Sequence, residues 1–244
     1  MNKHFIIITF FFSTSLTSQI LSDNFEQDMR VMNFASQFAL DNIMNTTKYE
    51  SSFSDIEGSE YFDNSFKTGT IENLNRDVYI KTPMRYNAFS DEIELVIVNN
   101  GIRSVRGLIK NEKIIPNIEE NQYFYLNYKK SKGKLIKGYL ISLYKGKDIE
   151  LFLKKRKKFL KGRVAKNSLD VSHPPKYVDD IEYYIRNNSD IPTYIKNSKK
   201  NIIDYFNKSK ELKEFIRSEN LNLDNSESII RLIKFYEGSV ANWY

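Results

Sequence analysis

Short apolar runs alternate with glycine-containing turns through the middle of the chain. Eight of the nine glycines fall between Gly58 and Gly162, and the runs between them show the two-residue alternation typical of strands. Asn100-Gly101 separates two such runs and suits a type I′ hairpin turn, because both residues tolerate positive φ angles. The pattern predicts a meander of about seven to nine antiparallel strands between Lys67 and about Leu160, as a curved sheet, an open barrel or a sandwich.

The pattern changes after the two prolines of "SHPP", residues 172–175. A further hairpin is predicted to turn at residues 187–190. Apolar residues then recur at helical spacing, which predicts three short helices at about 198–207, 210–219 and 226–237. Ser209 and Asn225 are candidate N-caps, and Gly238 suits the position after a helix end. Strands first and helices last predict an α+β fold.

The N-terminus has the pattern of a secretory signal peptide, with one lysine, an apolar run at 5–12 and small hydroxyl residues up to Ser18. The run is too short for a membrane-spanning helix, which needs ~20 residues. We expect cleavage after Ser18, a helix over about 24–43, and an acidic loop beyond it. The sequence thus predicts four regions along the chain. They are a signal peptide (1–18), an N-terminal helix and acidic loop (19–57), an antiparallel β domain (58–166), and a hairpin plus three helices (167–244).

Composition narrows the function classes. The chain has no cysteine, so neither a disulfide, a lipid-anchored cysteine nor a cysteine-based zinc site is available. Its formal charge of +6 is unevenly spread, because residues 19–66 hold nine acidic and two basic residues whereas residues 129–166 hold fifteen basic and two acidic ones. A lopsided charge of this kind favours association with charged partners.

The stretch "RYNAFSDEIELVI", residues 85–97, is the first candidate site. In a strand, Glu92 and Glu94 would point the same way about 6.5–7 Å apart, near the lower limit of the spacing used by inverting glycoside hydrolases. A structural interpretation is favoured, in which both glutamates face water opposite a buried stripe of Ile93, Leu95 and Ile97. Arg85 would then pair with Asp91 or Glu92 across a bend. Carboxylates facing water lack the raised pKa that a general acid needs.

The basic run "KKRKKFLKGR", residues 154–163, is the second candidate. Alternation places Ile149, Leu151 and Leu153 on a buried face, and Asp148, Glu150, Phe152 and Lys154 on a mostly wet one. A polyanionic glycan, an anionic lipid surface or an acidic partner would match such a run, whereas a secretory signal argues against nucleic acid. The alternative is a solvated strand end. The candidate binding residues are Lys154, Lys155, Arg156, Lys157, Lys158, Lys161 and Arg163.

No catalytic or cofactor motif accompanies these candidates. His173 stands beside two prolines without the partners of a zinc cluster or a nucleophile triad, so we expect a loop residue there. Gly133 and Gly138 lie in strand and turn contexts, without the following helix of a phosphate loop. The sequence therefore indicates neither a metal nor a cofactor.

Several phrases and their order resemble a family of small secreted proteins of Bacteroidota. These are "GSEYFDNSFKTGTI" (58–71), "MRYNAFSDEIEL" (84–95), "LISLYKGKDIELFLKKRKKF" (140–159) and "ELKEFIRSENLNLDNSESIIRLIKFYEG" (211–238). The family has no assigned activity, so the resemblance assigns no functional residue. It implies a signal peptide, a home in the cell envelope and a structural role for the "RYN…SDE" phrase at a strand bend.

Two functions of different classes are compatible with these observations. We favour a non-enzymatic protein of the cell envelope that acts as a binding module or as a subunit of an outer-membrane-associated assembly. After signal cleavage it would be periplasmic, associated with the outer membrane or secreted. The alternative is a carboxylate-dependent glycan hydrolase, in which Glu92 and Glu94 would supply the carboxyl groups.

Overall fold

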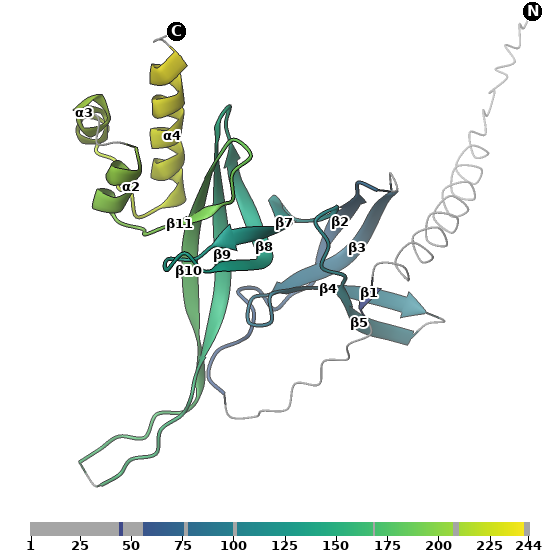
Figure 1. Ribbon diagram of the computed structural model, residues 1–244. Helices are drawn as coiled ribbons and strands as arrows, with labels where there is room; N and C mark the ends of the chain where they lie inside the picture. The colour runs from purple at the N-terminus through teal and green to yellow at the C-terminus, as the bar shows by residue number, and fades with distance from the viewer. Residues whose placement is uncertain are drawn as a thin grey trace, which may run out of the picture. The chain divides into compact units, whose positions relative to one another are not determined.

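The molecule is built of strands followed by helices, as the computed structural model shows (Figure 1). The described residues are 44–45, 56–75, 78–99, 102–167, 169–206 and 210–241. The expected signal peptide, its cleavage site and the helix at 24–43 lie outside them. The described residues confirm an α+β fold with C-terminal helices.

Six strands make up the first part of a mostly antiparallel sheet, in the order β1-β5-β4-β3-β2-β6. Alternate positions of β2, β3 and β4 carry Ile71, Ile80, Met84, Ile93 and Leu95, which are all buried. The alternation is the physical reason why these segments form strands with one apolar face. The bounds are Met44–Asn45 for β1, Lys67–Asn73 for β2, Val78–Asn87 for β3, Glu92–Asn99 for β4, Ile102–Leu108 for β5 and Ile114–Ile118 for β6.

The remaining five strands close into a ring. β7, β8, β9, β10 and β11 pair successively as antiparallel neighbours, and β11 returns to β7 through a parallel pair of Thr193 with Lys129. The inside of the ring is packed with Tyr128, Leu140, Phe152 and Tyr184. The bounds are Asn121–Lys129 for β7, Leu135–Lys145 for β8, Ile149–Leu160 for β9, Lys176–Asn187 for β10 and Thr193–Ile195 for β11.

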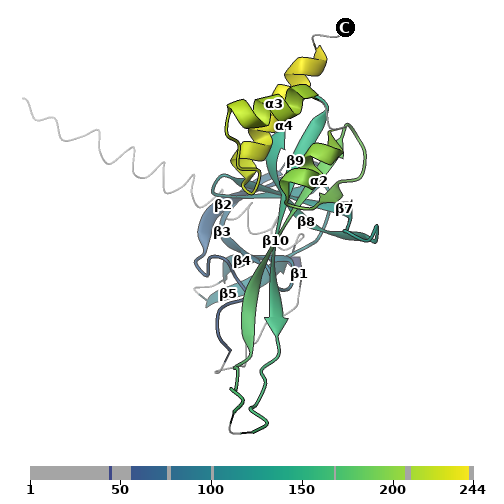
Figure 2. The same ribbon diagram turned by 90° about the vertical axis from the view of Figure 1, so that its left-hand side faces the viewer.

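Three helices, α2 (Lys199–Tyr205), α3 (Lys210–Ser218) and α4 (Ser226–Ala241), cover the outer face of the ring near one end of β9 and β10 (Figure 2). Their apolar side chains share a core with Leu151 of β9 and Ile185 of β10. The two strands therefore bury side chains on both faces where the helices lie.

The helix α4 also holds the turn between β8 and β9. The Glu237 carboxylate accepts hydrogen bonds from the backbone N–H groups of Asp148 and Ile149 at 2.9 and 3.0 Å and from the Tyr144 hydroxyl at 2.8 Å. A side chain at position 146 would displace this carboxylate, because a Cβ atom there would lie 2.2 Å from a Glu237 carboxylate oxygen. A tertiary contact thus specifies a turn that the sequence marks only with glycine.

The strands β9 and β10 pair from Ile149 with Asn187, near the helices, to Leu160 with Lys176 at the other end. The described residues between these two strands, 161–167 and 169–175, are called the hairpin tip. The hairpin tip extends away from the helices in both views (Figures 1 and 2).

Most of the predicted elements are confirmed. The strands β2 to β9 fall within the predicted meander, β10 and β11 form the predicted hairpin, and the three helices lie where helical spacing places them. Asn225 caps α4, since its side-chain oxygen accepts from the Ser228 N–H at 2.8 Å. The prediction for Gly238 is wrong, because α4 continues through it to Ala241. Asn100 and Gly101, like the candidate cap Ser209, lie outside the described residues.

Candidate functional site

The first candidate site is a closed hydrogen-bonded cluster around Glu94. This residue is only 1% exposed, which corrects the expectation that it faces water. Its carboxylate accepts from Arg85 Nε at 2.8 Å, from the Tyr61 hydroxyl at 2.8 Å and from Asn87 Nδ2 at 3.1 Å. Arg85 therefore pairs with Glu94, and not with Asp91 or Glu92 as expected. The expected buried stripe of Ile93, Leu95 and Ile97 is confirmed.

Aromatic rings complete the surroundings of Arg85. Its guanidinium carbon lies 3.9 Å from the Tyr61 ring centroid and 4.3 Å from that of Phe66, and its Nη1 donates to the Asn64 carbonyl at 2.8 Å. Burial, reinforced by Glu94, raises the pKa of Tyr61, so its hydroxyl stays protonated and donates to the carboxylate. A carboxylate already held by three donors is an acceptor within the fold.

Glu92 lies apart from this cluster, since its carboxylate pairs with Lys110 Nζ at 3.4 Å. The two glutamates thus have different partners, one buried and one near the surface. The arrangement offers no support for the expectation of a glycan hydrolase that uses Glu92 and Glu94 together.

The second candidate, the basic run, begins with a lysine enclosed by the ring. Lys154 is 1% exposed, which corrects its expected place on a wet face, and Phe152 on the same face is also buried. Lys154 Nζ donates to Asp91 Oδ1 at 2.6 Å and to the Tyr139 carbonyl at 2.8 Å. Burial lowers the pKa of Lys154 to about 8, although Asp91 opposes this shift.

Asp91 reaches Lys154 because two backbone positions permit it. Asp91 has a φ of 57° in the turn between β3 and β4, and Gly138 of β8 leaves room for its carboxylate. A Cβ atom at Gly138 would lie 2.2 Å from Asp91 Oδ2. The Tyr86 hydroxyl also donates to Asp91 at 2.7 Å. These contacts connect the first part of the sheet to the ring, so Lys154 has a structural role.

The middle of the basic run faces acidic residues of β10. Arg156 contacts Asp180 and Glu182, and Lys158 Nζ pairs with Asp180 Oδ1 at 2.9 Å. Lys157 Nζ, on the other face, lies 2.5 Å from Asp179 Oδ1. These partners were not predicted, although the acidic residues of "YVDDIEYY" (177–184) are a visible signal in the sequence. A basic strand beside an acidic strand pairs its charges across the ladder.

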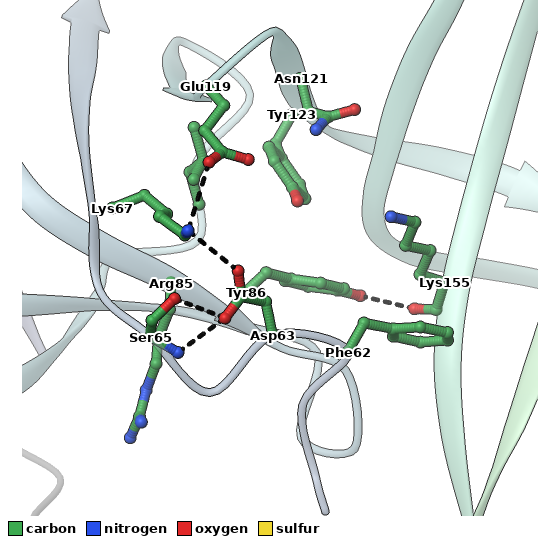
Figure 3. A pocket seen from close by; sticks show the side chains of 11 residues that line it. Phe62, Asp63, Ser65, Lys67, Arg85, Tyr86, Glu119, Asn121, Tyr123 and Lys155 are labelled. Atoms are coloured by element: carbon green, nitrogen blue, oxygen red, sulfur yellow. Dashed lines mark hydrogen bonds and ion pairs between the residues drawn. The ribbon is translucent and has the colours of Figure 1, made fainter.

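A small pocket of about 80 Å³ lies between the first part of the sheet and the ring (Figure 3). On one side Lys67 bridges Asp63 at 3.4 Å and Glu119 at 3.6 Å, and on the other Lys155 lies over the Phe62 ring at 5.5 Å. Small-molecule sites usually span ~300–1,000 Å³. The pocket is large enough for two or three waters, at ~30 Å³ each, and does not by itself indicate a ligand.

The end of the basic run is open to solvent. The Lys158 side chain is 58% exposed despite its contact with Asp180, and Lys161 and Arg163 are exposed at the start of the hairpin tip. Arg163 contacts Asp170 at 2.6 Å, whereas no acidic partner of Lys161 occurs among the described residues. Lys166 and Lys176 add two exposed cations that the predicted set omitted.

His173 is an exposed loop residue, as expected, and its backbone pairs with that of Arg163. No cluster of His, Asp and Glu in the described residues could hold a metal ion. None of the helices that the structure describes is long and apolar enough to cross a membrane.

Comparisons with known proteins return no relative of this chain. No model of a protein family matches it, and neither a curated protein nor a solved structure is significantly similar to it.

Proposed function

We propose that the chain is a non-enzymatic protein of the cell envelope that binds an anionic partner, either as a binding module or as a subunit of an outer-membrane-associated assembly. The predicted signal peptide and the resemblance to secreted proteins of Bacteroidota support the location. The enclosed state of Glu94 supports a binding role over hydrolysis, because its carboxylate already serves three donors.

One observation carries the proposal: three lysines at the far end of the β9–β10 hairpin have no acidic partner among the described residues. Nearer the helices, Lys154 is buried and Lys155 lies over the Phe62 ring. Arg156 and Lys157 face acidic residues of β10. Lys161, Lys166 and Lys176 are exposed and have no acidic partner among the described residues. Of the predicted binding residues, Lys161 therefore remains the strongest candidate. Lys158 and Arg163 are exposed but already contact Asp180 and Asp170.

The attraction should be electrostatic and therefore sensitive to salt. Exposed charges are screened over a Debye length of ~8 Å at physiological ionic strength. A partner held by these lysines would thus bind tightly at low salt and weakly at high salt. An envelope glycan, an acidic protein or anionic lipid supplies the required charge.

Charge reversal tests the proposal. In the full-length protein, Lys161→Glu, Lys166→Glu and Lys176→Glu together should abolish binding to immobilised heparin, measured over a salt series. The matched control is Lys196→Glu, Lys200→Glu and Lys213→Glu, which makes the same charge change at exposed positions outside the hairpin. The control should keep most of the binding, because it leaves the hairpin unchanged.

The same pair of variants should be compared in pull-downs from envelope membranes, where the wild-type protein and the control retain a partner that the hairpin variant loses. Equal heparin binding by the two variants, or no binding by the wild-type protein at low salt, would overturn the proposal.

A further inference from the structure

The hairpin tip exposes apolar side chains as well as cations. Val164, Leu169 and Val171 are 81%, 96% and 65% exposed, so each keeps most of its surface in water. Leu160, where β9 ends, is also exposed. Aliphatic side chains grouped at a projecting turn, rather than scattered singly, mark a surface that is covered in the working state.

The backbone of the hairpin tip is held by its own hydrogen bonds. Arg163 and His173 exchange two backbone bonds of 2.8 and 2.7 Å, and the Asp170 carboxylate accepts from the N–H groups of Lys166 and Val171 at 3.2 and 2.9 Å. The Ser172 hydroxyl accepts from the Ala165 N–H at 2.9 Å. Polar groups that are already paired lose less on leaving bulk water, so such a turn is suited to the polar headgroup region of a bilayer.

Cations surround the apolar side chains. Residues 161–176 contain Lys161, Arg163, Lys166 and Lys176 against the single acid Asp170, which Arg163 contacts. The hairpin tip and its base therefore carry a net charge of 4 − 1 = +3, with histidine neutral. The charge complements a surface of anionic headgroups, while the aliphatic side chains suit the boundary with the acyl chains beneath them.

We propose that the hairpin tip docks on an anionic lipid bilayer, with Val164, Leu169 and Val171 entering the headgroup region and Lys161, Lys166 and Lys176 contacting lipid phosphates. The inference rests on the proposed function, because it names the anionic partner of the same cations. A heparin-like glycan would satisfy the cations alone. The bilayer also covers three aliphatic side chains that project from a convex turn.

Membrane binding requires both the lysines and the aliphatic side chains, because a few residues of either kind do not anchor a protein alone. Each basic residue near an anionic surface contributes roughly a fivefold gain in binding. Reversal of three lysines should then weaken vesicle binding by at least about a hundredfold. Loss of the apolar contacts should weaken it by about tenfold without changing the electrostatic part.

The experiment compares three forms of the full-length protein in co-sedimentation with vesicles of phosphatidylcholine, alone or with one third phosphatidylglycerol. Wild-type protein should bind only the anionic vesicles. The variant Val164→Ser, Leu169→Ser and Val171→Ser should bind the anionic vesicles about tenfold more weakly yet bind heparin as the wild-type does. The matched control, Val98→Ser, Ile102→Ser and Val105→Ser, removes exposed aliphatic side chains of β4 and β5 and should bind both.

A direct measure of insertion is available because the chain has no cysteine. Leu169→Cys carries a single polarity-sensitive dye to the hairpin tip, and Ile102→Cys places the same dye at another exposed position. Emission should shift to the blue with anionic vesicles for Leu169→Cys only. Unchanged emission of the Leu169→Cys dye, or vesicle binding by the serine variant equal to that of the wild-type, would overturn the lipid inference. The proposed function would still hold if the wild-type protein binds heparin. Loss of both heparin and vesicle binding by the wild-type protein overturns both.

Discussion

The two ends of the β9–β10 hairpin share one pairing register but have different surroundings. Near the helices, Phe152 and Lys154 point into the ring and Leu151 packs against the helices, so both faces are buried. Beyond the ring, Lys158 and Phe159 are exposed. Side-chain alternation is the same in both halves, and what differs is the number of layers that cover the strands.

The comparison also shows how position changes the role of a lysine. Lys154 and Lys158 lie on the same face of β9, four residues apart. One is held by Asp91 and the Tyr139 carbonyl inside the protein, and the other meets Asp180 at the surface. A buried charge needs its partners, whereas an exposed pair contributes little to stability.

Removal of an aromatic ring from each half of the hairpin should give the largest difference between the two halves in the free energy of unfolding. Phe152→Ala empties a site inside the ring and should lower the free energy of unfolding by about 3–5 kcal/mol, from lost burial and the remaining cavity. Phe159→Ala, on a partly exposed ring beside Tyr177, should lower it by about 1 kcal/mol or less. Urea denaturation of both variants measures the difference. Similar losses would mean that the far half is as well packed as the ring.

Removal of a lysine from each half of the hairpin should give the next largest difference in the free energy of unfolding. Lys154→Ala leaves the Asp91 carboxylate without its cation and should lower the free energy of unfolding by about 3 kcal/mol. Lys158→Ala should change it by about 0.5 kcal/mol or less, because the Lys158 side chain is mostly in water and Asp180 keeps Arg156 as a partner. Thermal and chemical unfolding of the two variants tests this. A cost for Lys158→Ala equal to that of Lys154→Ala would contradict the contrast.

The pH dependence of stability should show the smallest difference. Burial lowers the pKa of Lys154 to about 8, whereas an unfolded lysine titrates at 10.5. Between these values the unfolded chain binds more protons at this residue, so the free energy of unfolding rises with pH. The gain is complete above 10.5 and lost as pH falls through about 8. The buried tyrosines have raised pKa values and begin to oppose this gain only near pH 10, where unfolded tyrosine ionises.

Urea denaturation from pH 7.5 to 9.5 measures the effect in wild-type protein and in Lys154→Met. Over this range, the free energy of unfolding of the wild-type protein should rise by at most about 2 kcal/mol relative to that of Lys154→Met. Lys158→Met is the control and should follow the wild-type curve. Parallel curves for wild-type and Lys154→Met would show that Lys154 titrates normally in the folded protein.

Local patterns were sufficient to locate most strands and all three described helices. The hairpins joining β4 to β5, β7 to β8 and β8 to β9 follow from apolar runs separated by turn residues, since pairing of neighbouring segments needs little beyond a suitable turn. Helical spacing in 226–237 similarly located α4, but not its end, because Gly238 is only a weak helix breaker.

The candidate sites depended on contacts between distant segments. Glu94 looked like a solvent-facing residue because its strand alternates, yet Tyr61, 33 residues earlier, and Arg85 of β3 enclose it. The acidic partners of Arg156, Lys157 and Lys158 lie in β10, and a count of charges over 129–166 could not assign them. The acidic residues of β10 were visible in the sequence. Assigning each of them to a basic residue of β9 required the register of the two strands.

The sequence by itself determined which segments become strands and helices, the order of these elements and the excess of positive charge, because each depends on residues close together in the chain. Only the tertiary structure decided that β9 is buried on two faces near the helices and exposed at its far end. Closure of the ring pairs β11 with β7, and the helices then cover the outside of β9 and β10. Alternation in the sequence predicts which residues share a face of a strand. The burial of each face depends on which other elements pack against it.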